Sequence, residues 1–252
     1  MERGLITPNL SQLVEFVGMP GSGKSTISHA FAEALRESGR DVWEPVWDNF
    51  RLLSDRNRRL SKVRIAARQV LTLRRQTFAD LGAILGSSQS RPAAYPSTAL
   101  NWFYISGLCR VAERRPGVSV FDQGVLQAVW SVVYGSDSLD ESSIDVWAAR
   151  AGESLPPGSV AAFVDADEPT IRKRLAMRTA GRGRIDDALA GPDSQLDLAL
   201  EKGFAALEFV EQAAGCLKQA GRLQIVRLDS TVSAPESLAL DLVRALSRDG
   251  LC

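Results

Sequence analysis

The sequence predicts an α/β fold with three layers, α/β/α, around a five-stranded and mostly parallel sheet. Five short apolar runs have the character of buried strands, and segments with helical periodicity separate them. These runs are 13–17, 42–46, 118–121, 160–164 and 223–228. Strands that alternate with helices form parallel sheets that are covered on both faces. Ligands bind such sheets at the carboxyl ends of the strands, so the chemistry is expected there.

The first fifty residues form one β-α-β unit. Between the first two strands, apolar residues recur with the spacing of one helix face. These residues are Ile27, Ala30, Phe31, Ala34 and Leu35. Gly39 stands where the end of this helix calls for a left-handed residue. The chain then enters the strand predicted for 42–46.

The rest of the chain is interpreted as part of the same single domain, 1–252, with two additions. Residues 48–115 are mostly helical in pattern and form a predicted insertion. Residues 172–194 combine a short helix with a glycine-containing polar stretch and form a predicted lid. The sequence from Ser233 to Glu236 is a capping box that begins a final helix.

Composition limits the classes of partner. The 252 residues include 30 basic and 30 acidic side chains, so net charge gives no argument for nucleic acid or a membrane surface as partner. Cys109, Cys216 and Cys252 are few and widely spaced, which is typical of reduced cytosolic thiols. The sequence shows no signal peptide and no long apolar span. We therefore expect a cytoplasmic protein whose partner is a small molecule, and a homodimer stays open.

The strongest motif directly follows the first strand. It matches G-x-x-x-x-G-K-[ST] in full, with a strand before it and a helix after it, which is the context that a phosphate-binding P-loop requires. The motif residues are Gly18, Met19, Pro20, Gly21, Ser22, Gly23, Lys24 and Ser25. Glycines let the backbone N–H groups turn inward toward an anion, and the helix N-terminus adds positive potential. The motif predicts a P-loop NTPase fold that binds a nucleoside triphosphate and Mg²⁺.

Each motif side chain has an expected role. Lys24 would contact the β- and γ-phosphates, Ser25 would ligate Mg²⁺, and Thr26 would add a phosphate contact. The motif alone does not separate GTPases, motor ATPases and kinases. The guanine-reading sequence Asn-Lys-x-Asp is missing, and Asp122-Gln123-Gly124 does not match the switch motif Asp-x-x-Gly. The acids from Asp165 to Glu168 are interpreted as the start of a helix, where the helix dipole favours negative charge.

Four segments in order resemble the nucleotide and nucleoside kinase superfamily, in particular its thymidylate kinase and deoxynucleoside kinase branches. After the P-loop comes Trp43-Glu44-Pro45-Val46, similar to the Glu-Pro-Val element of deoxynucleoside kinases. Phe121-Asp122-Gln123-Gly124 stands at the place of the acidic-Arg pair, and Arg172 to Asp187 looks like the arginine-bearing lid. Asp229-Ser230-Thr231 matches the adenine-side loop in position.

The resemblance implies roles for several residues. Glu44 would be the base that accepts a proton from the acceptor hydroxyl, with Asp48 as the reserve candidate. Asp122 ends an apolar strand and is expected to hold Mg²⁺ or to orient the substrate; a helix N-cap is the alternative. Gln123 replaces the family's arginine and would contact the acceptor.

Arginines are concentrated in two regions. Arg174, Arg178, Arg182 and Arg184 are closely spaced in the predicted lid, and we prefer Arg178 and Arg182 as contacts for the transferred phosphate. A second run lies between residues 51 and 75, where a solvated helix face is the alternative to an anion site.

The sequence thus favours an ATP-dependent kinase of a small molecule: a nucleoside, a nucleotide, or a specialised metabolite such as an antibiotic. Transfer would be to a hydroxyl or a phosphate. The alternative is a regulatory or accessory ATPase without such an acceptor, because Gln123 replaces an arginine. A third hypothesis, phosphorylation of nucleic-acid ends, requires salt-sensitive binding by the 51–75 helices.

Overall fold

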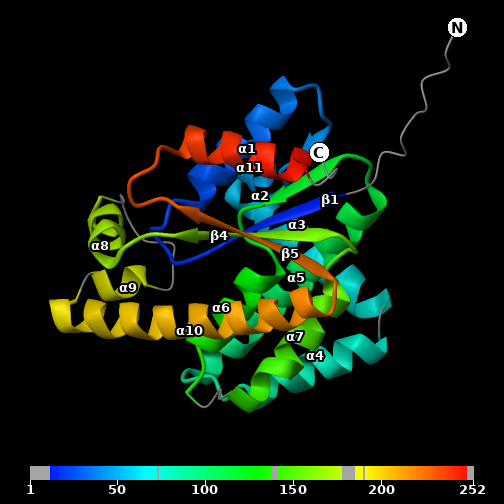
Figure 1. Ribbon diagram of the computed structural model, residues 1–252. Helices are drawn as coiled ribbons and strands as arrows, with labels where there is room; N and C mark the ends of the chain where they lie inside the picture. Colours follow the sequence, from blue (N-terminus) through cyan, green and yellow to red (C-terminus); the bar gives the residue numbers. More distant parts are fainter. Residues whose placement is uncertain (1–11, 73, 138–140, 178–184, 190, 249–252) are drawn as a thin grey trace, which may run out of the picture.

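The structure, a computed structural model, describes residues 12–72, 74–137, 141–177, 185–189 and 191–248. Its centre is a sheet with the strand order β2-β3-β1-β4-β5 (Figure 1). The strands are β1 (Gln12–Val17), β2 (Val42–Trp43), β3 (Val118–Phe121), β4 (Ser159–Asp165) and β5 (Leu223–Asp229). All neighbouring pairs in this sheet are parallel. The predicted three-layer α/β class with a five-stranded parallel sheet is confirmed.

One face of the sheet is covered by two helices that pack against each other, α1 (Lys24–Glu37) and α11 (Pro235–Arg248) (Figure 1). The buried side chains of α1 include Ile27, Phe31 and Leu35 of the predicted apolar stripe. On α11, Leu238, Leu242 and Leu246 are buried against them. Gly39 has φ of 82°, as expected for the left-handed residue after α1.

The other face carries the larger core. It is covered by α5 (Tyr95–Arg114), α6 (Val125–Tyr134), α7 (Ile144–Ser154) and α10 (Asp193–Gln219). Trp102 of α5 and Trp147 of α7 meet edge to face, with ring centroids 5.4 Å apart. Phe103 and Tyr104 are buried beside Trp102, so these aromatic side chains build the core rather than an exposed surface.

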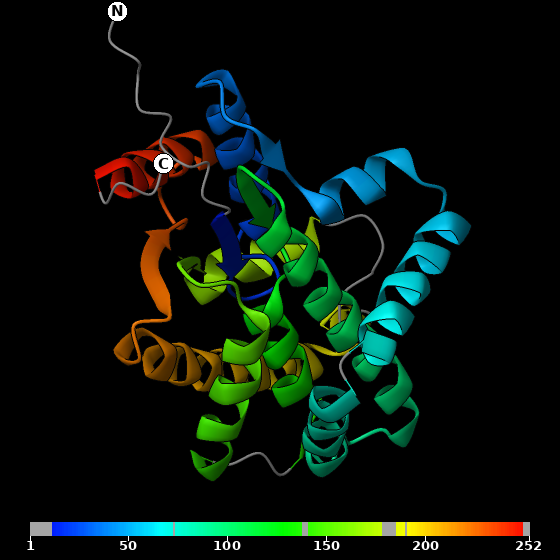
Figure 2. The ribbon, with the colours of Figure 1, turned by 90° about the vertical axis from the view of Figure 1, so that its right-hand side faces the viewer.

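Three helices form a flank beside the sheet: α2 (Pro45–Leu52), α3 (Asp55–Thr72) and α4 (Arg74–Gly86) (Figure 2). Together with α5 they extend from Pro45 to Arg114 and so make up most of the range 48–115. Helix α3 packs closely on α5, because a Cβ at Gly107 would lie only 2.7 Å from the Ile65 side chain. Among the described arginines of α3, Arg56, Arg59, Arg64 and Arg68 are exposed.

The predicted strand 42–46 is wrong beyond residue 43. Strand β2 has two residues, and Pro45 already begins α2. Proline suits the first turn of a helix, because the N–H that it lacks has no partner there anyway. Glu44 therefore lies between a strand and a helix, and this changes the direction in which its side chain points.

The remaining elements are short. They are η1 (Pro92–Ala94), η2 (Glu141–Ser143), α8 (Glu168–Ala176) and α9 (Asp186–Leu189). Asp167 caps α8 by accepting the backbone N–H of Thr170 at 2.9 Å, which confirms that this acidic stretch starts a helix. Across the described residues, none of the helices combines the length and the apolar character that crossing a membrane would need.

The packing of α1 against α11 can be tested by a substitution that leaves a cavity between them. Leu242→Ala removes a side chain with no exposed surface and should lower the free energy of unfolding by about 2–5 kcal/mol. Leu240→Ala, on the same helix but 47% exposed, should change it by less than about 0.5 kcal/mol. Urea denaturation measures both. Equal effects of the two substitutions would contradict this packing of α11.

Candidate active site

The phosphate-binding loop leaves the carboxyl end of β1, the central strand, and leads into α1. Gly21 and Gly23 have φ of 90° and 92°, a conformation that glycine adopts without strain. Gly18 lies against β4, where an added Cβ would be 2.5 Å from the carbonyl oxygen of Val164. The glycines of the motif therefore allow both the turn and its close approach to the neighbouring strand.

Lys24 begins α1 and folds back over this loop. Its Nζ donates hydrogen bonds to the carbonyl oxygens of Gly18 at 2.8 Å and Met19 at 2.9 Å. Ser25 and Thr26, in the first turn of α1, are exposed. An ammonium group and a helix N-terminus at one place make a site of positive potential that suits an anion.

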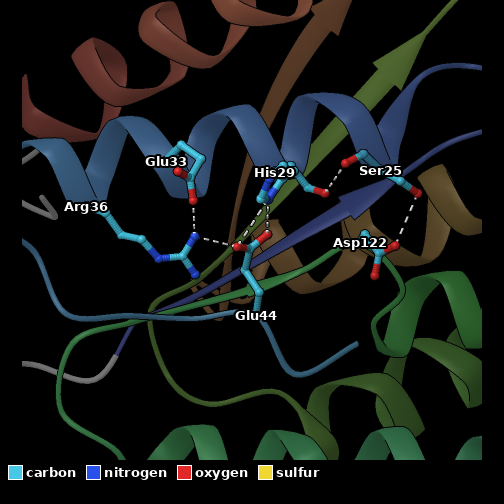
Figure 3. A network of polar contacts seen from close by, with 7 residues as sticks. Ser25, His29, Glu33, Arg36, Glu44 and Asp122 are labelled. Carbon is cyan, nitrogen blue, oxygen red and sulfur yellow. Dashed lines mark hydrogen bonds and ion pairs between the residues drawn. The ribbon is translucent and has the colours of Figure 1, made fainter. Parts of the chain in front are cut away.

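Asp122 lies beside Ser25, although 97 residues separate them in the chain. Asp122 follows β3, which pairs directly with β1. The Ser25 hydroxyl donates to Oδ2 of Asp122 at 3.1 Å (Figure 3). Burial raises the pKa of Asp122 above its usual range, and the Ser25 hydrogen bond and the nearby Lys24 charge offset this only in part. A hydroxyl and a carboxylate that converge in this way are the oxygen donors that Mg²⁺ prefers, so the residues fit this ion.

Behind the loop, Arg174 of α8 connects three segments. Its guanidinium donates to the carbonyl oxygens of Ser22 at 3.1 Å and of Ser230 at 2.7 Å, and to Oγ of Ser230 at 3.0 Å. The Ser230 hydroxyl itself donates to the Ser22 carbonyl at 2.6 Å. The P-loop is therefore held from behind by α8 and by the turn that follows β5.

A cavity of about 310 Å³ opens beside this contact. It is lined by Gly21, Gly23, Thr26, Ile27, Arg174, Ser230, Ser233 and Pro235. Its volume is within the range of small-molecule sites. The turn after β5, which the sequence assigned to the adenine side, forms one wall of this cavity.

The preferred lid arginines, Arg178 and Arg182, lie outside the described residues. Arg174 belongs to the same predicted group, and the structure brings it to the P-loop. The sequence signal for it was its position on a helix directly after β4, whose carboxyl end faces the site. Spacing alone could not rank it above its neighbours.

The side chain of Glu44 points toward α1. Its side chain is 4% exposed, and Oε2 lies 2.7 Å from Nη1 of Arg36. Its Oε1 lies 3.2 Å from Nδ1 of His29, so both oxygens have partners on one face of α1 (Figure 3). A general base must reach the proton that it removes. The pair Ser25–Asp122 and the group around Glu44 are thus two separate clusters.

The cluster around Glu44 resembles a metal site in composition. His29, Glu33 and Glu44 each offer a ligand atom, and these atoms lie within 4.8 Å of one another. Arg36 also contacts Glu33, at 2.5 Å, so a guanidinium already supplies the positive charge that both carboxylates need. The ring of His29 stacks on Trp47 at 4.2 Å. We therefore interpret the cluster as an ion-pair network that fixes the start of α2.

The other two predicted substrate contacts are differently placed. Asp48 lies one turn into α2, half-buried, and its backbone N–H donates to the Glu44 carbonyl at 2.8 Å. Gln123 is exposed immediately after Asp122. Gln123 therefore lies next to Asp122, after β3, whereas Asp48 lies on α2.

Two residues that the sequence analysis did not select also belong to this region. Oε1 of Gln127, from the first turn of α6, accepts the N–H of Gly18 at 3.2 Å. The backbone N–H of Gln127 donates to Oε1 of Glu15 on β1 at 2.8 Å. A charged residue in an apolar strand seldom occurs without a partner. The rule that identified Asp122 would therefore also have identified Glu15.

A scan against protein-family models gives no match, and a search of curated proteins gives none either. The structure is similar to that of deoxyadenosine kinase from M. mycoides, with a TM-score of 0.51 and 14% identity. The match covers 94% of this chain and 99% of that chain. The chain has a P-loop kinase fold.

Two other solved structures match less closely in shape. Shikimate kinase from Acinetobacter baumannii, in complex with shikimate, has a TM-score of 0.45 and 12% identity, over 96% of both chains. The Bacillus subtilis protein YorR, in complex with phosphorylated GDP, has a TM-score of 0.42 and 12% identity, over 94% of this chain and 97% of that one. The likeness to deoxyadenosine kinase concerns the fold.

Arg174 can be tested against its neighbour. Arg174→Met removes the three hydrogen bonds to Ser22 and Ser230, so a nucleoside triphosphate should bind about tenfold or more weakly. Arg172→Met changes an arginine on the same helix that pairs with Glu168 and Asp197 instead, and binding should stay within about twofold. Titration with a fluorescent nucleotide measures both. Unchanged affinity in Arg174→Met would exclude this role.

Proposed function

We propose that this protein transfers the γ-phosphate of ATP to a small molecule, with Mg²⁺ as cofactor. The observation that carries the proposal is the hydrogen bond between Ser25, on the P-loop, and Asp122, after β3. It joins a phosphate-binding loop to a carboxylate in the arrangement that a nucleotide-bound magnesium ion requires. The fold shared with a solved kinase agrees with this function.

The chain's own residues divide the work of phosphate transfer. The N–H groups of the P-loop and the first turn of α1 hold the β- and γ-phosphates. Lys24, now bonded to the carbonyl oxygens of Gly18 and Met19, supplies a mobile positive charge over the loop. Ser25 and Asp122 would hold the magnesium ion, which would neutralise charge on the β- and γ-phosphates. Arg174 keeps the loop in place from behind.

The nucleobase would occupy the cavity between the P-loop and the turn after β5. One wall is the Arg174 side chain, whose planar guanidinium can stack on a ring. Ser230 and Ser233 line another part with small polar groups. The missing guanine-reading motif makes ATP the expected nucleotide.

The acceptor would lie between Asp122 and the helices α2 and α3. Residues 48–115 contain thirteen basic and four acidic residues, although the whole chain is balanced. Such an excess suits an acceptor that carries negative charge, such as a phosphate or a carboxylate. The exposed arginines of α3 would attract it.

The residue that accepts the acceptor's proton would come from α2 or from the residue just before it. Glu44 has both oxygens engaged by Arg36 and His29, so both already belong to an ion-pair network. Asp48 follows one turn later and is half-buried. We therefore favour Asp48 over Glu44 as the base for a hydroxyl acceptor. An acceptor phosphate, already ionised, would need neither.

The function is tested by incubating the protein with ATP and Mg²⁺ across a panel of nucleosides, nucleotides, sugars, and aminoglycoside- or nucleoside-type antibiotics. Mass spectrometry should find one product with an added phosphate. Lys24→Ala removes the positive charge that would contact the β- and γ-phosphates. In this variant the rate should fall about 100-fold or more.

Two controls make this test decisive. Lys218→Ala, at the far end of α10 where the side chain is exposed, should keep the wild-type rate. Circular dichroism should show Lys24→Ala folded, because its side chain serves phosphate rather than packing. Product formation at the wild-type rate by folded Lys24→Ala would remove the mechanism. ATP turnover that never yields a phosphorylated acceptor would favour the regulatory alternative.

The choice of base is tested with two neutral isosteres. Asp48→Asn should lower kcat for a hydroxyl acceptor by about 100-fold, while ATP binding is unchanged. Glu44→Gln should chiefly lower the melting temperature, because Arg36 and His29 lose a buried carboxylate partner. Steady-state kinetics and thermal unfolding separate these effects. A large loss of kcat in Glu44→Gln with a normal melting temperature would return the role to Glu44.

A further inference from the structure

Glu15 is a carboxylate in the middle of the central strand. It lies on β1 between Leu13 and Val17, and these neighbours on the same face of the strand belong to the larger core. Glu15 is 1% exposed. Burying a carboxylate is costly unless hydrogen bonds compensate it, so its partners indicate its role.

The partners of Glu15 are the first backbone groups of α6. Oε1 accepts the N–H of Gln127 at 2.8 Å. Gly124, at the N-terminus of α6, has no side chain to cap the helix, and an added Cβ there would lie 2.3 Å from Cδ of Glu15. Glu15 thus takes the place of an N-cap, reaching the helix from a neighbouring strand, where the helix dipole favours its negative charge.

The anchored turn of α6 contacts the phosphate site in two ways. Oε1 of Gln127 accepts the N–H of Gly18, the first residue of the P-loop. Asp122 stands two residues before Gly124 and accepts the hydroxyl of Ser25. One carboxylate thus restrains both the P-loop and the loop that carries Asp122.

We propose that Glu15 is a positioning residue for ATP·Mg²⁺: by anchoring the first turn of α6, it sets Gln127 against Gly18 and Asp122 against Ser25. This inference rests on the proposed nucleotide site. It does not require an acceptor, so it can be tested by binding alone. Glu15 acts through Gln127 and the α6 turn and need not contact the nucleotide itself.

Burial supports this role. It raises the pKa of Glu15, the backbone N–H groups at the start of α6 offset this only in part, and the resulting pKa is about 7. Asp80 of α4 provides a matched case elsewhere in the core. It is 2% exposed, and burial raises its pKa to about 6. Asp80 lies 3.7 Å from Arg150 of α7, and helix α4 packs on α3, α5 and α7 rather than on the P-loop.

The experiment compares Glu15→Gln with Asp80→Asn, each a neutral isostere of a buried carboxylate. A fluorescent ATP analogue is titrated at several Mg²⁺ concentrations, and thermal unfolding is recorded in parallel. Glu15→Gln should raise the Mg²⁺ concentration for half-maximal binding about tenfold or more, as for residues that orient metal ligands. Asp80→Asn should leave this concentration unchanged, whatever it does to the melting temperature.

A second variant covers the case in which Glu15→Gln does not fold. Gln127→Met keeps the backbone bond to Glu15 and a similar side-chain volume, but removes the acceptor for the Gly18 N–H. It should weaken ATP·Mg²⁺ binding in the same direction. Normal binding in Gln127→Met, or a Glu15→Gln variant that alters only the melting temperature, would overturn the proposal. A wild-type protein that binds ATP·Mg²⁺ but phosphorylates nothing would instead count against the proposed function.

Discussion

The candidate site depends on β1 being hydrogen-bonded on both sides. This strand pairs with β3 through Gln12 to Glu15 and with β4 through Val14 to Val17. Both partners are parallel to it, so three carboxyl ends meet at one edge of the sheet. The P-loop, Asp122 and the carbonyl of Val164 are brought together for this reason. Glycine at position 18 then follows from the closeness of β4, because a Cβ has no room there.

Two buried carboxylates lie near this edge, and they have partners of different kinds. Glu44 faces an arginine and a histidine on α1, so its charge is matched by side chains and it fixes the junction between β2 and α2. Glu15 faces the N–H groups that begin α6. These N–H groups belong to the backbone, so they move only when the helix moves. Glu15 therefore fixes the positions of Asp122 and Gln127 on either side of that turn, whereas the Glu44 network reaches no further than α2.

The sequence predicted the architecture well, because strand runs and helix stripes report burial locally. It also predicted the P-loop, because this motif too is local: the strand, the loop and the helix follow one another in the chain. It was wrong about residues 44–46, where Pro45 is compatible with a strand end but begins α2 instead. The contacts of Glu15 with Gln127 and of Ser22 with Arg174 join residues more than a hundred positions apart. The spacing of residues along the sequence carries no information on contacts between such distant residues. Only Glu15 could have been singled out, because it is a charged residue within an apolar strand.

The ionisation of Glu15 limits what this residue contributes to stability near neutral pH. Its pKa in the folded protein, about 7, is above the 4.5 of an ordinary glutamate. Between these values the folded protein binds more protons than the unfolded chain, so the contribution of Glu15 to stability is fully present below the lower value. It is lost as the pH rises through the upper one. A neutral side chain at this position would avoid that loss near neutral pH. The carboxylate is therefore better explained by the helix start that it holds, and by the phosphate loop and Asp122 that depend on that start.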